Sequence, residues 1–493
     1  MNFCCRRMKS EFLRERHVLT SLDSWRGTIV RWLPIRESSI CDLSEIDSFA
    51  GREMQVSTAA PTARYPLTSG QSTYYARMRE QPEMSGSIAA AYRIEGELDV
   101  GRFAKALART VAQHDALRIG LCDEQTDVPR QMVRPEPDNA SLLSLQQVRS
   151  SSEEQFGRYV QLVHGKDLAE PWDLATDYPF RFRLLRHSPT VHAFLAVFSH
   201  VAVDGRGMAL VLRDLWHNFE QDTAQPDGPS VPQRKSFVLA AQQHASSASP
   251  KAVGFWRQRI AENHPSGEPA RARPDAAQQQ GVTVRATLSG AERKLLRDRA
   301  RTFGCTEFQM TMAALADAVL SETFVGDRLH VWLPVDTRSP EEFDTSGMFT
   351  VSLPVALSRT SSLTEMTRQL RDEVMAVAAY RQMDPVTLSA LHSSFREIDT
   401  RRGWSIAATY FNRDQNPGER RARDIVARPG SYPANSYFIS RGVELDVVGG
   451  VESLRISVAF DSAFSADGTA DRLVNAFSVG LGGVDLEVVA HEA

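Results

Sequence analysis

The residue with the clearest capacity for chemistry is His200, in the string SHVAVDG at residues 199–205. An imidazole has an ordinary pKa of about 6.5 and can accept a proton near neutral pH. Asp204 and Gly205 close the same string, and together they are typical of a tight turn. The string is short, however, and by itself it fits a core histidine beside an exposed Asp-Gly turn equally well.

The segments on either side of this string predict how His200 is positioned. Residues 191–198 form an apolar run of strand length that is rich in β-forming residues. The residues after Gly205 place apolar side chains at helical spacing: Met208, Val211, Leu212, Leu215, Trp216 and Phe219. His200 is therefore expected on a connection from a buried strand to a helix. The end of a buried strand would hold His200 rigidly, and the connection would leave its side chain accessible to a substrate.

Further motifs follow in a fixed order along the chain. The string resembles the HHxxxDG motif of the condensation-domain and chloramphenicol acetyltransferase superfamily, and four other segments resemble motifs of nonribosomal peptide synthetase condensation domains. These segments are YPLTSGQ at 65–71, HDALR at 114–118, LPVDTR at 333–338 and TYFN at 409–412. The resemblance covers residues 61 to 490 and departs from the motif at Ser199, where the superfamily has a first histidine.

The resemblance implies a mixed α/β fold of two chloramphenicol-acetyltransferase-like lobes, arranged as a V-shaped pseudo-dimer with a tunnel between them. The length of 493 residues suits two lobes. We expect an N-terminal lobe at 61–235 and a C-terminal lobe at 236–493. Residues 1–60 are expected to be a disordered leader, or to result from a start placed too far upstream, with Met54 as a sensible start.

The resemblance also assigns roles to single residues. His200 is the expected catalytic residue, acting as a base or by positioning the nucleophile and stabilising the intermediate. Asp204 is expected to be structural and to pair with Arg338, while Ser199 would support the loop. Gly205 would let the backbone pass close to the substrate, unless it is a plain turn glycine. The expected tunnel residues are His114, Arg118 and Asn412, although His114 is more easily explained as packed or capping, and Arg118 as a brace.

The function implied is a free-standing condensation-type acyltransferase. It would join an acyl thioester to an amine or alcohol acceptor, giving an amide or an ester in specialised metabolism. The donor would ride on the phosphopantetheine arm of a carrier protein supplied in trans, and the enzyme itself would need no metal or cofactor. Two alternatives stay open: a coenzyme-A-dependent acyltransferase of the same superfamily, and a non-catalytic module that docks carrier proteins or synthetases.

Composition agrees with this expectation. The net charge of −4 gives no reason to expect nucleic acid or an anionic membrane as partner, and no apolar run is long enough to span a bilayer. The five cysteines are odd in number and match no zinc pattern, so they indicate reduced thiols in a cytoplasmic protein. We expect the protein to be a monomer.

Periodicity predicts alternating helices and strands through both halves. Helices are expected at 100–114, 307–320 and 363–381, with another from residue 291. Polar connections are expected at 221–235 and 262–280. Strands are expected at 88–98, 117–122, 180–185, 191–198, 282–288, 329–335, 351–357, 405–412 and 454–460.

Overall fold

The structure is a computed structural model whose described residues all lie in one compact unit, Met54–Ala493. The described residues are 63–80, 86–122, 129–138, 142–221, 235–245, 249–263, 282–323, 328–402, 405–412, 418–422, 424–430, 442–450, 453–460 and 468–489. The leader predicted at 1–60 and most of the two polar connections lie outside them, so these predictions stay predictions.

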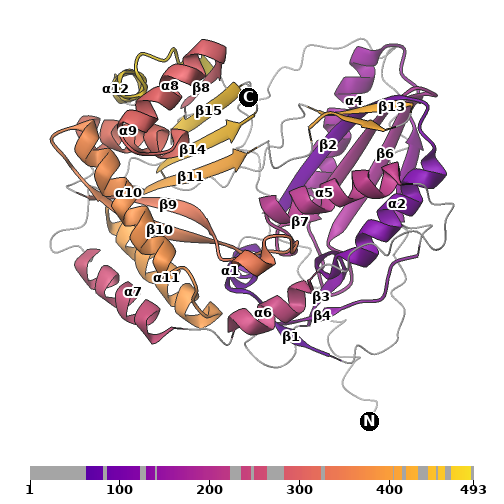
Figure 1. Cartoon of the computed structure of the whole chain (residues 1–493), viewed down its shortest axis with the longest axis horizontal. Helices are drawn as coiled ribbons and strands as arrows, with labels where there is room; N and C mark the ends of the chain where they lie inside the picture. Colours follow the sequence, from indigo (N-terminus) through magenta and orange to yellow (C-terminus); the bar gives the residue numbers. More distant parts are fainter. Residues whose placement is uncertain are drawn as a thin grey trace, which may run out of the picture. The chain divides into compact units, whose positions relative to one another are not determined.

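The first mixed sheet has six strands in the order β12-β13-β2-β7-β6-β5 (Figure 1). Its strands are β2 (Ser87–Gly96), β5 (Ser144–Gln147), β6 (Phe180–Ser188), β7 (Val191–Ser199), β12 (Arg420–Ala422) and β13 (Ile425–Pro429). Strand β13 pairs antiparallel with β2, so a segment from the C-terminal half of the chain completes this N-terminal sheet.

Helices cover both faces of this sheet. Strand β7 explains why: Phe194 and Phe198 belong to the core beneath α2 (Val100–Gln113) and α5 (Gly205–Glu220). Leu195 points to the other face, into the core beneath α4 (Glu153–Ala169). Successive side chains of a strand alternate between faces, so a strand buried on both sides must be apolar throughout. This is the run that the sequence shows before His200.

The second mixed sheet has seven strands in the order β10-β9-β11-β14-β15-β8-β16. Its strands are β8 (Val282–Ser289), β9 (Arg328–Asp336), β10 (Thr350–Ser358), β11 (Ser405–Asn412), β14 (Gly442–Gly449), β15 (Ser453–Phe460) and β16 (Glu487–Val489). Strand β14 alternates: Val443, Leu445 and Val447 are buried in the core, while Glu444 and Asp446 are half-buried on the other face.

Among the described residues, six helices belong to the same half of the chain. They are α7 (Pro250–Asn263), α8 (Gly290–Thr302), α9 (Glu307–Glu322), α10 (Leu363–Ala379), α11 (Pro385–Arg402) and α12 (Thr469–Leu481). Helix α9 is almost wholly buried, since ten of its residues are in the interior. It begins at a capping box in which Thr306 and Gln309 satisfy each other's backbone N–H groups.

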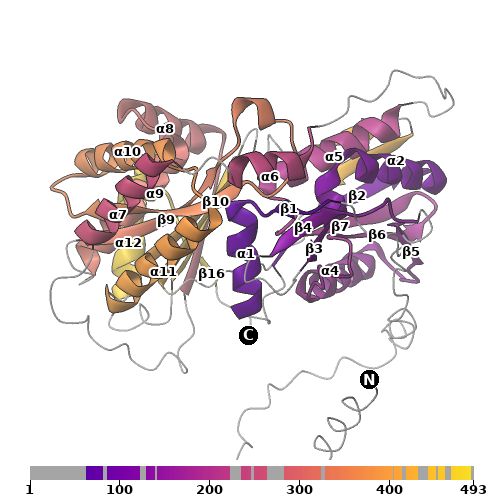
Figure 2. The same ribbon diagram turned by 90° about the horizontal axis from the view of Figure 1, so that it is seen from below.

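Short elements connect the two sheets. Strands β1 (Tyr65–Pro66), β4 (Arg130–Val133) and β3 (Ile119–Cys122) form a third sheet, accompanied by α1 (Ser69–Glu80), α6 (Phe237–Ala245) and the short 3-10 helices η3 (Asp115–Arg118) and η5 (Pro340–Glu342). Helix α1 lies beside α11 and β10 (Figure 2). Two side chains anchor its start: Thr68 Oγ1 donates to Met348 O at 2.6 Å and Ser69 Oγ donates to Met383 O at 2.5 Å.

The mixed sheets and their helices confirm the predicted α/β class, with two local corrections. The strand expected from residue 117 begins only at Ile119, because Leu117 N donates to His114 O and closes the 3-10 turn η3. The helix expected to reach residue 381 ends at Ala379, where Tyr380 N donates back to Val377 O.

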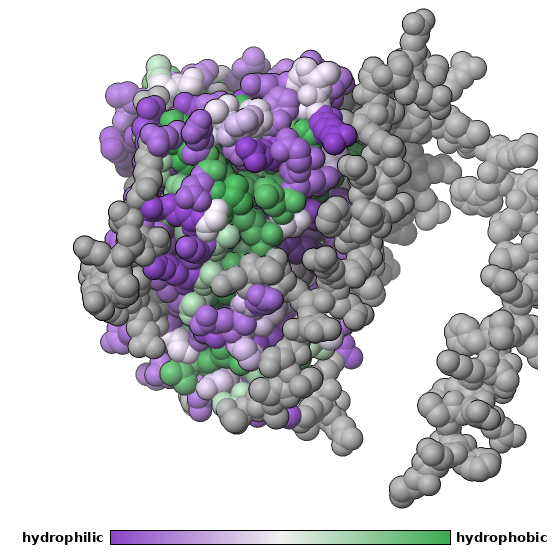
Figure 3. All heavy atoms as spheres, turned by 90° about the vertical axis from the view of Figure 1, so that its right-hand side faces the viewer, coloured by the Kyte–Doolittle hydropathy of each residue, from purple (hydrophilic) through white to green (hydrophobic). Residues whose placement is uncertain are grey.

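Apolar side chains are not confined to the interior. On the face of the molecule shown in Figure 3, hydrophobic residues gather in a central band between hydrophilic ones. Among the described residues, Leu145 of β5 and Leu162 of α4 are both about half exposed. None of the helices in the described part combines the length and the apolar character that a membrane crossing requires.

Candidate functional site

His200 lies between the end of β7 and the start of α5, as the sequence predicts. Its backbone N–H donates to Gly86 O at 2.7 Å, which ties the connection to the start of β2. Helix α5 begins just beyond, where Asp204 is the N-cap and its Oδ1 accepts from Gly207 N at 2.7 Å. A capping carboxylate satisfies N–H groups that have no partner within the helix, so it fixes where the helix starts.

The ring of His200 is half-buried and stacks on the ring of Tyr74 in α1, with 4.3 Å between centroids and 29° between planes. Its Nδ1 is buried and has no hydrogen-bond partner among the described residues. Burial lowers the pKa of His200 below its ordinary value, and the Asp204 carboxylate and nearby backbone groups offset part of that shift. The imidazole is therefore neutral near pH 7, the form that can accept a proton.

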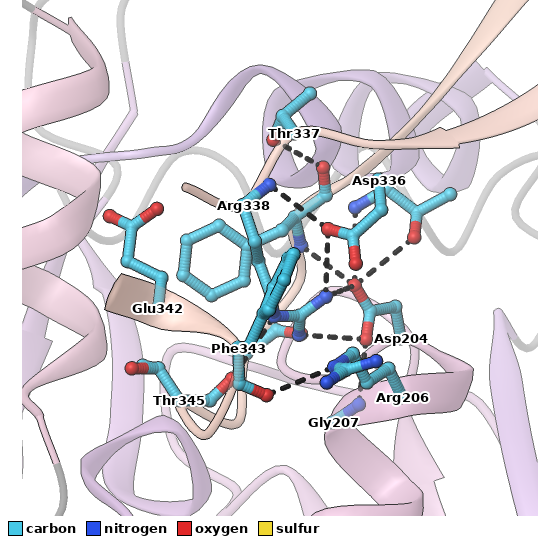
Figure 4. A network of polar contacts seen from close by, with 12 residues as sticks. Asp204, Arg206, Gly207, Asp336, Thr337, Arg338, Glu342, Phe343 and Thr345 are labelled. Carbon is cyan, nitrogen blue, oxygen red and sulfur yellow. Dashed lines mark hydrogen bonds and ion pairs between the residues drawn. The ribbon is translucent and has the colours of Figure 1, made fainter. Parts of the chain in front are cut away.

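Asp204 forms a bidentate ion pair with Arg338, shown in Figure 4. The guanidinium donates from Nη1 to Oδ2 at 2.8 Å and from Nη2 to Oδ1 at 2.9 Å. Both residues are 1% exposed. This confirms the pairing predicted from the sequence, across 134 positions of the chain.

Further donors fill the remaining acceptor positions of the Asp204 carboxylate. Its Oδ2 also accepts from Phe349 N at 3.0 Å, Thr350 N at 3.2 Å and Thr350 Oγ1 at 3.1 Å. Burial by itself would raise the pKa of Asp204, but the Arg338 charge and the hydrogen bonds outweigh it and hold the pKa below its ordinary value. The carboxylate stays ionised and is fully occupied, so it holds structure and has no oxygen left to act as a base.

Arg338 extends this network into the loop before β10. Its Nε donates to Thr345 O at 3.1 Å, its Nη2 to Gly347 O at 3.0 Å and its Nη1 to Asp336 Oδ1 at 3.1 Å. The guanidinium also lies 4.3 Å from the centre of the Phe349 ring. One arginine therefore holds the 345–349 loop against the N-terminus of α5.

Glycine is required at Gly207, two positions beyond the Gly205 that the sequence singled out. A Cβ at residue 207 would lie 2.8 Å from Gly347 N and 2.9 Å from Gly347 O, closer than real side chains approach backbone. Gly205 is half-buried and is the first residue of α5. The paired glycines of the string GRG were the available signal, but only the approach of the 345–349 loop shows which one the packing needs.

Ser199 is the last residue of β7 and lies opposite Ser87 of β2. It is 0% exposed, and its Oγ is buried with no hydrogen-bond partner within the described residues. Its backbone carbonyl accepts from Ala202 N at 2.9 Å. Any support that Ser199 gives to the loop therefore comes from its backbone and its small size.

The three expected tunnel residues are held in different ways. His114 is 1% exposed and contacts Asp214 Oδ2 through Nε2 at 3.1 Å and Ser346 Oγ through Nδ1 at 2.8 Å. Arg118 is half-buried and donates to the carbonyls of Arg134 at 3.1 Å and Ala112 at 3.3 Å. These contacts favour packing and bracing roles for both.

Asn412 ends β11, paired with Gly449 of β14, and its side chain lies outside the described part of the structure. The tunnel role of all three residues stays a prediction. Among the described residues no group of three or more histidine, cysteine, aspartate or glutamate side chains is arranged to hold a metal ion.

Comparisons with known proteins agree with this geometry. Residues 62–392 match the condensation domain family. The chain is 29% identical over 310 residues to a probable non-canonical nonribosomal peptide synthetase, CymA, of Salinispora arenicola. That alignment covers 59% of this chain and 4% of the synthetase, so the chain corresponds to a small part of its relative.

Two solved structures share the fold. The SgcC5 protein of Streptomyces globisporus superposes with a TM-score of 0.65 at 19% identity, covering 85% of this chain and 99% of that one. The X-domain from teicoplanin biosynthesis superposes with a TM-score of 0.66 at 17% identity, covering 87% and 99%. With a match to the family over residues 62–392 and this fold around His200, the chain belongs to the condensation domain family.

Proposed function

We propose that the chain is a condensation-type acyltransferase in which His200 accepts the proton of the attacking nucleophile. The observation that carries the proposal is the contrast within one string: a neutral, half-buried imidazole stands beside an aspartate already committed to an arginine. Because Nδ1 is buried, we assign the accepting role to Nε2. An imidazole of lowered pKa remains unprotonated across the neutral range and so stays available as a base.

The step balances without any metal or redox partner. The nitrogen of an amine, or the oxygen of an alcohol, attacks the carbonyl carbon of the thioester and gives its proton to Nε2 of His200. The tetrahedral intermediate then collapses, the carbon–sulfur bond breaks, and the imidazolium returns the proton to the departing thiolate. The products are an amide or ester and a free thiol.

For the donor, we propose an acyl group carried on the phosphopantetheine arm of a separate carrier protein. Support comes from the synthetase relative, which is far longer than this chain and matches it over a small fraction of its length. A carrier presents a protein surface besides the arm, and such a contact raises the local donor concentration and orients the thioester. We also propose that the protein acts as a monomer in the cytoplasm, where such carriers would meet it.

A second candidate function is a non-catalytic docking module. It is favoured by one specific observation, the serine at the first motif position, whose hydroxyl makes no hydrogen bond within the described residues. One of the solved neighbours is an X-domain, and it has been solved in complex with OxyB from teicoplanin biosynthesis. A module of this kind would keep the fold and the Asp204–Arg338 brace while its histidine did no chemistry.

Turnover separates the two functions. Wild-type protein is mixed with acyl-loaded carrier proteins, or with acyl-pantetheine or acyl-coenzyme A thioesters, and with a panel of amines and alcohols. Products are identified by mass spectrometry. An acyltransferase gives amides or esters that vanish in His200→Ala and persist in His217→Ala, a matched control on the exposed side of α5. Absence of any product across the panel, with stable capture of a carrier protein, would favour the docking module.

The donor class is read from kcat/KM with one acceptor. Carrier-bound thioesters should be used far better than the matching coenzyme A thioesters, because both present the same pantetheine arm and only the carrier adds a protein contact. Equal values, or a preference for coenzyme A, would assign the chain to the coenzyme-A-dependent class.

A further inference from the structure

We propose that Tyr74 is the positioning residue of His200: its ring, stacked on the imidazole, sets the plane in which Nε2 meets the nucleophile. This inference rests on the proposed function and adds a residue that none of the sequence motifs assigned a role. It starts from a question that the site geometry raises, namely what fixes the imidazole ring.

A catalytic histidine is commonly oriented by a hydrogen bond at the ring nitrogen that does not react. No side chain plays this part for His200: within the described residues its buried Nδ1 makes no hydrogen bond of good geometry, and the hydrogen-bonding groups that raise the pKa of the ring are backbone groups of His200 and Val203. The nearest candidate in sequence, Asp204, has both carboxylate oxygens occupied by Arg338 and by backbone N–H groups. Neither a carboxylate nor another side chain therefore orients the imidazole through Nδ1 within the described residues.

The ring of His200 does contact one aromatic side chain, that of Tyr74, and the geometry of this stack suits the task. The centroids are 4.3 Å apart and the planes differ by 29°, close to a parallel arrangement. Such an arrangement leaves the edge of the imidazole free while it restricts tilting of the ring. Burial raises the pKa of Tyr74 to about 12, with Arg77 acting against this shift and Asp204 adding to it, so the ring is a neutral phenol at working pH.

Tyr74 is itself held firmly enough to orient another ring. It packs against the apolar cluster that contains Leu67, Trp172 and Val201. Its helix α1 is anchored at the start by the bonds from Thr68 and Ser69 to the C-terminal half of the chain. The backbone of His200 is fixed separately by Gly86, the residue before β2. The backbone of His200 is thus held by Gly86, whereas its ring is held by Tyr74 of α1.

A spectroscopic test reads the stack without any substrate. Histidine-labelled protein gives ring C–H signals for its 12 histidines, and the His200 signal is assigned by its loss in His200→Ala. A ring proton above an aromatic face is shielded, so the His200 signal should lie upfield in the wild type. It should move downfield in Tyr74→Leu and stay upfield in Tyr74→Phe. Tyr75→Leu, at the neighbouring tyrosine of the same helix, is the matched control and should leave the signal unchanged.

Kinetics then test positioning, with the donor and acceptor that give turnover in the wild type. Tyr74→Leu should lower kcat about tenfold while KM changes less than about twofold, because misplacement of a catalytic group weakens the chemical step. Tyr74→Phe should restore kcat to within about threefold, since the ring and not the hydroxyl does the positioning. If Tyr74→Leu does not fold, Tyr74→Met takes its place, and the wild-type shift is measured independently of either variant.

An unshifted His200 signal in the wild type would overturn the inference, as would an unchanged kcat in a folded Tyr74→Leu protein or a Tyr74→Phe protein as slow as Tyr74→Leu. These results differ from failure of the proposed function. In that case His200→Ala would keep full turnover, or the wild type would show none, while the spectroscopic shifts would still report the stack.

Discussion

Two side chains of one short string, His200 and Asp204, are held in opposite ways. Asp204 is bound by an arginine, three backbone N–H groups and a hydroxyl, so its pKa is lowered and its position is fixed. His200 is held by its backbone and one stacked ring, with an unpaired Nδ1. The difference teaches that a side chain whose acceptor positions are all occupied holds structure, whereas a half-buried imidazole outside the ion-pair network stays available for chemistry.

The largest expected effect is the loss of activity when His200 is replaced. His200→Ala should abolish measurable turnover, a loss of about 10²–10⁴-fold, which is the usual contribution of a positioned acid–base group. The melting temperature should stay close to the wild-type value, because the half-buried ring takes part in no ion pair and its Nδ1 makes no hydrogen bond of good geometry within the described residues. Turnover and circular dichroism are measured on the same samples. Near-wild-type turnover in His200→Ala would show that His200 takes no part in the reaction, and the proposed difference in role between His200 and Asp204 would be wrong.

The Asp204–Arg338 ion pair should contribute to the free energy of unfolding. Asp204→Ala should cost about 3–5 kcal/mol of unfolding free energy, because it leaves the Arg338 charge buried without its partner. Replacing both residues, as in Asp204→Ala with Arg338→Met, should cost less than the sum of the two single changes. Urea unfolding of the four proteins gives the coupling. Additive costs would show that the pair is not the unit we describe.

A substitution at the contact between α5 and the 345–349 loop should have an intermediate effect on stability. Gly207→Ala should destabilise the protein by about 1–3 kcal/mol, as overpacking does, because the new methyl group meets Gly347 backbone atoms. Gly205→Ala is the matched variant two positions away. Thermal unfolding of both tests whether Gly207 is the closer contact, and a larger loss for Gly205→Ala would reverse that assignment.

The acid side of the pH profile tests the state of His200. Burial lowers the pKa of His200 below 6.5, the ordinary value for histidine. As the pH falls, the imidazole should therefore stay neutral until the pH reaches this lowered pKa. The acid limb of kcat/KM should therefore fall at a pH below 6.5. Activity is lost only as the pH drops through the lowered pKa and protonates the base. A limb above 6.5 would show that another group controls the reaction or that the imidazolium is stabilised.

Ser199→Ala is expected to have the smallest effect. Loss of a neutral hydrogen bond costs about 0.5–1.5 kcal/mol, and the Ser199 hydroxyl makes none within the described residues. The rate should therefore change by less than about tenfold, and the stability should be unchanged or slightly higher. The measurement is kcat beside that of His200→Ala. An equally large loss would place Ser199 in the reaction and make it part of the active group.

The sequence by itself determined the local elements and the position of His200. The apolar run at 191–198 predicted a buried strand, and the apolar spacing after Gly205 predicted a helix, because these periods follow from backbone geometry alone. The family resemblance added the partner Arg338, which no local pattern could have matched to a residue 134 positions away.

Only the tertiary structure decided which side chains meet. The stack of Tyr74 on His200, the unsatisfied hydroxyl of Ser199 and the need for glycine at 207 all depend on segments distant in the chain. The same holds for β13, which joins the sheet of the other half. Local periodicity states which face of an element is apolar, but contacts between elements are set by how their surfaces pack, and that depends on the whole chain at once.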